Sequence, residues 1–109
     1  MIAETIDRTL VAVAEPHRRR IVDLLRERPR RAGELASAVG LSPAALSRHL
    51  RVLRTSGLVE ESHPKLDARV RVYALRAAPV AGLRAWLDAT EQLWVDQLAA
   101  FKVHVERLE

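Results

Sequence analysis

The fold is decided by the stretch Ala32-Gly-Glu-Leu-Ala-Ser-Ala-Val-Gly40, followed directly by Leu41-Ser-Pro-Ala-Ala-Leu-Ser-Arg-His-Leu-Arg-Val-Leu-Arg54. Gly40 can end a short helix over 32–39, Ser42 can cap the next helix, and Pro43 suits its first turn. On a helical wheel, one face of that second helix is leucine and the opposite face is small, polar or basic. The leucines are Leu46, Leu50 and Leu53, and the opposite face carries Ala44, Ser47, Arg48, Arg51 and Thr55. The pattern predicts a helix-turn-helix at about 32–55.

Two helices are expected before this motif. The spacing of Ile2, Ile6, Leu10 and Val13 predicts an amphipathic first helix that ends near Glu15-Pro16. Pro16 then begins a second helix with the apolar face Ile21, Leu24 and Leu25, which should stop before Pro29.

A β-hairpin is expected after Gly57, because the apolar pattern changes to period two over 58–63 and 69–75, around Pro64-Lys-Leu-Asp-Ala68. Its second strand places Arg69, Arg71, Tyr73 and Leu75 on one face and Val70, Val72 and Ala74 on the other. Beside a helix-turn-helix, such a hairpin is a wing, at about 58–75.

The remaining residues, about 79–108, predict one long helix with an apolar side chain at every seventh position: Val80, Leu87, Trp94, Phe101 and Leu108. Thirty helical residues span roughly 45 Å, more than a small domain needs to cover its own core. In one interpretation, Trp86, Trp94 and Phe101 pack against the first helix of the same chain. The favoured reading is a dimer through both terminal helices, with the interface residues Ile2, Ile6, Leu10, Leu87, Trp94, Leu98, Phe101 and Val105.

The expected fold is therefore mainly α with a small β-hairpin: a winged helix-turn-helix with four helices, two strands and a fifth helix. A length of 109 residues with 49% hydrophobic content suits a single domain over 1–109. No stretch resembles a transmembrane segment or signal peptide, so no membrane partner and a cytoplasmic location are expected.

Positive charge is concentrated in the middle of the chain. Residues 17–76 carry 14 Arg or Lys against 6 Asp or Glu, a net charge of +8, whereas each flank sums to −2. This distribution can be an ordinary solvated surface, but beside a helix-turn-helix and a basic hairpin it indicates binding to double-stranded DNA. A protein-binding winged helix is the competing class.

The expected mechanism places the helix that begins after Ser42 in a major groove. Arg48 can pair with guanine, Ser47 with either strand, and Ala44 or Ala45 with a thymine methyl, while Arg51 grips phosphate. His49 lies at the face boundary, where a local hydrogen bond is as good an interpretation as DNA contact. On the wing, Lys65, Arg69 and Arg71 would reach the backbone or minor groove, and the run Arg18-Arg19-Arg20 is expected to be helix surface.

Neither a metal nor another cofactor is expected. The chain has no cysteine, and no two of its four histidines form a short pair. His104, Glu106 and Asp96 are the residual candidates, and Asp96 and His104 are poorly aligned on one helix. No phosphate loop, nucleophile motif or paired carboxylates indicate an enzyme.

The motifs Glu15-Pro-His-Arg-Arg-Arg-Ile-Val-Asp-Leu-Leu25, Glu34-Leu-Ala36 and Leu41-Ser-Pro-Ala-Ala-Leu-Ser-Arg-His-Leu-Arg-Val-Leu-Arg-Thr-Ser-Gly-Leu-Val59 resemble those of ArsR-type winged-helix repressors. The resemblance covers about residues 5–108, with Tyr73-Ala-Leu75 where the wing strand ends. It implies a homodimeric bacterial repressor that binds a pseudo-palindromic operator.

The family's metal ligands are cysteines in the recognition region or Asp and His pairs on the last helix, and neither set is matched. The tryptophan-containing last helix is similar to the metal-independent branch. The wing lacks the usual glycine and is similar to MarR-type regulators. A small-molecule inducer, bound between the terminal helices and the helix-turn-helix core, is neither required nor excluded by the sequence.

Overall fold

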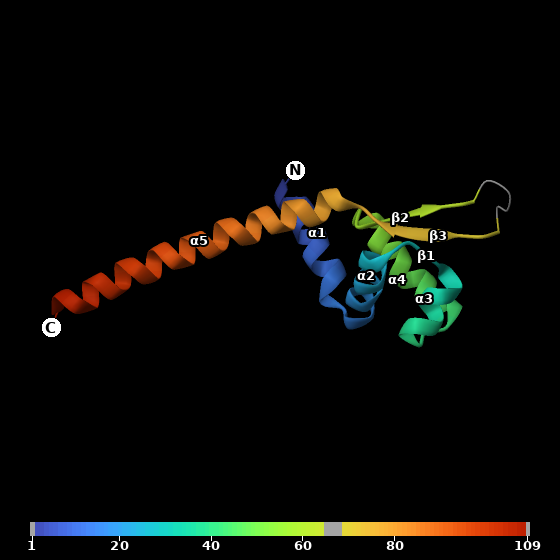
Figure 1. Ribbon diagram of the computed structural model, residues 1–109, viewed down its shortest axis with the longest axis horizontal. Coiled ribbons are helices and arrows are strands. Elements are labelled where there is room, and N and C mark those ends of the chain that lie inside the picture. Colours follow the sequence, from blue (N-terminus) through green and yellow to red (C-terminus); the bar gives the residue numbers. More distant parts are fainter. Residues whose placement is uncertain (1, 65–68, 109) are drawn as a thin grey trace.

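The described part of the chain folds into five helices and a small sheet (Figure 1). The computed structural model describes residues 2–64 and 69–108, with side chains from Glu4 onward within these ranges. In chain order the elements are α1 (Ile2–Ala14), α2 (Pro16–Glu27), β1 (Arg30–Arg31), α3 (Ala32–Val39), α4 (Pro43–Thr55), β2 (Val59–Ser62), β3 (Val72–Leu75) and α5 (Ala77–Leu108). This architecture confirms the expected single-domain winged-helix fold.

The helix boundaries follow from local chemistry. Ser42 Oγ accepts a hydrogen bond from the Ala45 N–H at 3.2 Å, and Pro43 opens α4. Gly40 ends α3 in the left-handed conformation, at φ +68°. Glu15 is an unexpected N-cap of α2, since its carboxylate accepts from the Arg18 N–H at 2.9 Å.

The sheet has three strands rather than the two of the expected hairpin. β1 pairs antiparallel with β3, and β2 pairs antiparallel with the other edge of β3, giving the order β1-β3-β2. β1 is only two residues long and has no apolar alternation, so periodicity could not reveal it. Arg28, which precedes Pro29, is extended, and Arg30 and Arg31 then pair with Tyr73 and Val72.

The core lies where α2, α3 and α4 meet the sheet. Its best-buried side chains include Ile21 of α2, Leu35 of α3 and Leu53 of α4, all fully enclosed. On the side of the sheet, the core is completed by the buried residues Leu58, Val59 and Tyr73. A mostly aliphatic core of this kind holds the two helices of the helix-turn-helix in one orientation.

The terminal helices pack against each other, and then α5 extends alone away from the rest of the domain (Figure 1). Every residue from Glu91 to Leu108 is exposed, and the molecule is 71 Å long but only 28 Å and 22 Å across. In α1 the inward face carries Ile6, Thr9 and Ala12, whereas Leu10 and Val11 are exposed. The apolar spacing did not reveal that Thr9 faces the core, where its hydroxyl donates a hydrogen bond to the Thr5 carbonyl at 2.8 Å.

Gly40 provides a test of the helix-ending geometry. In Gly40→Ala the new Cβ would touch nothing within 4 Å. The substitution should therefore lower the free energy of unfolding only because alanine disfavours the left-handed conformation, by about 1–2 kcal/mol. Gly33→Ala is the matched control, because Gly33 lies within α3 and its Cβ also has open space; alanine there should be neutral or stabilising by up to about 1 kcal/mol. Urea denaturation that ranks the two variants equally would contradict this account.

Candidate nucleic-acid interface

The two faces of α4 differ completely in burial. Leu46, Leu50 and Leu53 are at most 3% exposed. The opposite face is exposed and carries Ala44, Ser47, Arg48 and Arg51, while Ala45 is half-buried. The recognition-helix residues expected from the sequence therefore lie together on one outward surface, at the N-terminal end and middle of the helix.

The arginines of α4 are not equivalent. Arg54 NH1 lies 2.9 Å from Glu61 Oε2 of β2, so this guanidinium is held by the protein. Among the described residues, neither Arg48 nor Arg51 has a hydrogen-bond or ion-pair partner, and both are exposed. Their charges are thus available to an external anion, as reading a guanine or gripping a phosphate requires.

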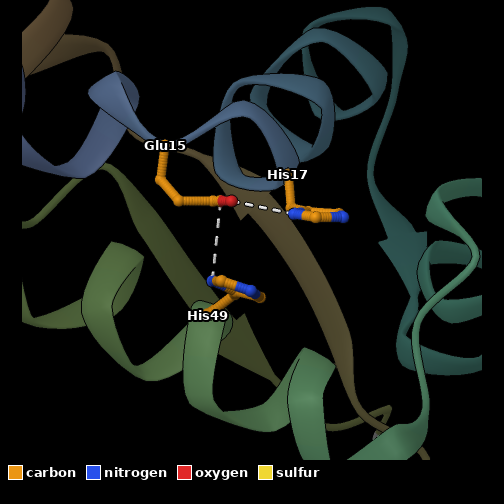
Figure 2. Close-up of side chains that lie close together, drawn as sticks. All are labelled: Glu15, His17 and His49. Carbon is orange, nitrogen blue, oxygen red and sulfur yellow. Dashed lines mark hydrogen bonds and ion pairs between the residues drawn. The ribbon is translucent and has the colours of Figure 1, made fainter.

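His49 points away from this outward surface, toward the start of α2 (Figure 2). Its Nδ1 accepts a hydrogen bond from Arg18 NH1 at 3.3 Å and lies 3.8 Å from Glu15 Oε2. Its ring stacks on that of His17, with the centroids 5.6 Å apart. Of the two interpretations left open by the sequence, the local hydrogen bond is the one that the structure contains.

The expectation that Arg18 is helix surface is wrong. Its Nε donates to the Ala12 carbonyl at 2.7 Å, and its NH2 donates to the Val11 carbonyl at 3.3 Å. The guanidinium therefore satisfies carbonyls at the end of α1 while it contacts α4. Sequence reasoning missed this role because the three consecutive arginines look alike without the tertiary neighbours.

Glu15 is the second residue that sequence reasoning missed. Desolvation alone would raise the pKa of its carboxyl group. The hydrogen bond from His17 Nδ1 at 2.8 Å, the N–H groups of Arg18 and His17 and the nearby His49 outweigh that effect and lower this pKa from 4.5 to about 2.

Glu15, His17 and His49 form a cluster whose ligand atoms all lie within 4.8 Å of one another. The only short-range signal is the Glu15-x-His17 spacing, because His49 is distant in sequence.

Glu61 anchors the base of the wing. Its carboxylate accepts from the Tyr73 hydroxyl at 3.1 Å and pairs with His63 at 3.2 Å, while the Arg71 guanidinium lies 4.0 Å away. Burial, followed by the contact with Glu61, raises the pKa of Tyr73. β3 begins at Val72, so Arg69 and Arg71 precede the strand in which they were expected. Arg71 still approaches the same carboxylate as Tyr73, which offsets part of its positive charge. Arg69 is exposed, and Lys65 lies outside the described residues.

The dimer-interface candidates separate into two groups. Leu87, Trp94, Leu98, Phe101 and Val105 of α5 are 38–64% exposed, as is Leu10 of α1 at 38%. Ile6 is buried within its own chain, and the side chain of Ile2 lies outside the described residues. The interpretation in which Trp86, Trp94 and Phe101 fill the core of their own chain is therefore wrong, since Trp86 is also exposed.

A groove of about 540 Å³ lies between α1 and α4. Its walls come from Asp7, Arg8, Val11, Arg51, Val52, Thr55 and Ser56. Val11 and Val52 give it apolar surface, and Arg51 connects it to the outward face of α4.

No helix in the described ranges combines the length and the apolarity needed to cross a membrane.

Comparison with known proteins agrees with this geometry. Residues 15–61 match the bacterial regulatory protein, arsR family. The chain is 37% identical over 95 residues to the HTH-type transcriptional regulator Rv2034 of Mycobacterium tuberculosis, covering 87% of this chain and 83% of that protein.

Two solved structures extend the likeness to the whole fold. The ArsR-like transcriptional regulator from Rhodococcus sp. RHA1 is 25% identical with a TM-score of 0.82, covering 97% of this chain and 94% of that one. The homodimeric winged helix-turn-helix DNA-binding domain Mb0332 from Mycobacterium bovis is 25% identical with a TM-score of 0.65, covering 87% of this chain and 85% of that one.

A helix-turn-helix with an outward arginine face and an adjacent wing defines a DNA-binding transcriptional regulator. The chain belongs to the ArsR family of bacterial regulatory proteins. Its relatives are transcriptional regulators and not enzymes.

Replacement of Arg48 tests the outward face of α4. Arg48→Ala should weaken binding to a specific site by about 1–3 kcal/mol, or roughly 5- to 150-fold, if Arg48 pairs with a base. Arg26→Ala is the control, because Arg26 is an exposed arginine of α2 with only a long 3.9 Å contact to Asp23. Fluorescence anisotropy with a specific and a scrambled duplex measures both; equal losses for the two variants would contradict the assignment.

Proposed function

We propose that the protein is a homodimeric repressor that occupies a pseudo-palindromic operator in the cytoplasm, with half-sites one helical turn apart or a multiple of it. The observation that carries this proposal is the exposed apolar surface of α5. At 32 residues, α5 is about 48 Å long, and every residue from Glu91 to Leu108 is exposed where the helix extends away from the other elements (Figure 1). Bound at a promoter, such a dimer would exclude the transcription machinery.

The composition of α5 supports a second copy as the partner. Exposed side chains on the face centred on Trp94 include Leu98, Phe101 and Val105, and Leu10 and Val11 of α1 add further exposed apolar surface. Monomeric proteins rarely expose apolar patches of this extent, and an isologous contact would bury each patch against its own copy. That Mb0332 is homodimeric is in keeping with this arrangement.

DNA recognition is proposed to divide between the helix and the wing. The N-terminal residues Ser42, Ala44, Ala45 and Ser47 approach base edges with Arg48, and Arg51 neutralises a phosphate. Lys65, Arg69 and Arg71 on the wing contact the backbone or the minor groove. His49 contributes indirectly, because its contacts with Arg18 and Glu15 fix the orientation of α4 relative to α2.

We propose that release from DNA responds to a small organic ligand, as in MarR-type regulators, rather than to a metal bound by the family's cysteine or last-helix ligands. The groove between α1 and α4 supports this idea. It is large enough for a small molecule, and its wall includes Arg51, so an occupant would alter the position of a proposed phosphate contact.

A substitution that introduces one charge on α5 can distinguish a homodimeric repressor from a monomeric protein-binding module. Phe101→Asp would bury a carboxylate in the proposed interface, so it should convert a dimer into a monomer and weaken DNA binding at least tenfold, since one recognition helix then binds alone. Val103→Asp is the control, because Val103 is also exposed but lies on the opposite side of the helix. Sedimentation equilibrium and anisotropy with a duplex bound by the unmodified protein provide the two measurements.

A monomeric unmodified protein, or a Phe101→Asp dimer indistinguishable from Val103→Asp, would contradict the dimer. Failure to bind any duplex at low salt would favour the protein-binding module, because phosphate neutralisation is strongest there.

A further inference from the structure

We propose that Glu15, His17 and His49 bind one divalent transition-metal ion of the Zn²⁺ class, at the junction of α2 with the recognition helix. These residues come from two segments of the chain that meet only in the folded protein (Figure 2). The site differs from the family's ligand sets, since it uses neither cysteine nor α5. The proposal concerns metal binding by the protein alone and is independent of its operator.

The donor set has the chemistry that such ions prefer. Two imidazole nitrogens and a carboxylate oxygen match the ligands of three-residue zinc sites, which keep a further position for water. His17 Nδ1 is 2.8 Å from Glu15 Oε1, and His49 Nδ1 is 3.8 Å from Glu15 Oε2. Because all three ligand atoms lie within 4.8 Å of one another, side-chain rotations are enough to bring them to metal-ligand distances near 2.1 Å.

The backbone holds this cluster in place before any ion arrives. Glu15 caps α2, and the Arg18 N–H fixes one of its carboxylate oxygens. His49 is held on α4 by the buried leucines on either side of its turn, Leu46 and Leu50. The His17 side chain is 49% exposed while those of Glu15 and His49 are 28% and 21% exposed, so the site opens to solvent on the His17 side. Water can therefore complete the coordination.

Arg18 places a positive charge beside this cluster. Its NH1 lies 3.3 Å from His49 Nδ1, so this contact must break before a metal binds that nitrogen. The His49 ring has to rotate away from NH1, because the planar guanidinium is anchored through its Nε and NH2 on the Ala12 and Val11 carbonyls. The nearby positive charge lowers the affinity of the site for a cation.

Cobalt provides the direct test, because Co²⁺ bound in place of Zn²⁺ absorbs visible light according to its coordination. The full chain, freed of metal with a chelator, should bind one Co²⁺ per chain with a saturable visible absorption that added Zn²⁺ abolishes. Each of His17→Gln, His49→Gln and Glu15→Gln should weaken binding by at least about tenfold. His63→Gln is the matched control, because His63 is a similarly exposed histidine beside a single carboxylate, Glu61.

The decisive variant is His17→Gln, whose half-exposed side chain can be replaced with little effect on packing; circular dichroism verifies that it is folded. Absence of saturable absorption at about a tenfold excess of Co²⁺ would overturn the proposal. So would equal Co²⁺ affinity in His17→Gln and His63→Gln.

Discussion

The burial of Leu46, Leu50 and Leu53 against α2, α3 and the sheet is the contact on which the rest of the structure depends. Each enclosed leucine contributes about 1.5–3 kcal/mol, so rotation of α4 about its axis would lose most of that energy. Because the α-helix repeats every 3.6 residues, this single constraint directs Arg48 and Arg51 outward and His49 toward α2. The outward arginine surface of α4 and the Glu15–His17–His49 cluster are two consequences of the same packing.

The arginines of the chain have different roles, which depend on their neighbours in the folded protein. Arg18 bonds to the end of α1, Arg30 pairs with Glu27 at 2.6 Å, and Arg54 pairs with Glu61. These guanidiniums are engaged by groups of the protein itself. In α4, the guanidiniums of Arg48 and Arg51 have no partner among residues 2–64 and 69–108, so they are available to an external anion. Dimerisation through α5 would bring together two such α4 surfaces, one from each copy of the chain, and would set the distance between them.

The helices were predictable because their signals are local: Ser42 caps, Gly40 terminates, Pro16 and Pro43 begin a helix, and the leucine spacing is regular. The third strand was not, since Arg30 and Arg31 form β1 only through pairing with β3. For the same reason the sequence assigned Arg18 to the surface and did not reveal that Glu15, His17 and His49 lie together. His17 and His49 are 32 positions apart, and no periodicity brings them together. The side-chain accounts of Lys65 and Ile2 remain predictions.

The central claim is that two copies joined through α5 present two recognition helices to one operator. Selection of binding sites from random duplexes, followed by sequencing, tests it most directly. The claim predicts an enriched pseudo-palindrome whose half-sites lie about 10 base pairs apart, centre to centre, or a multiple of that spacing. Enrichment of a single, non-repeated half-site, or of no sequence at all, would contradict it.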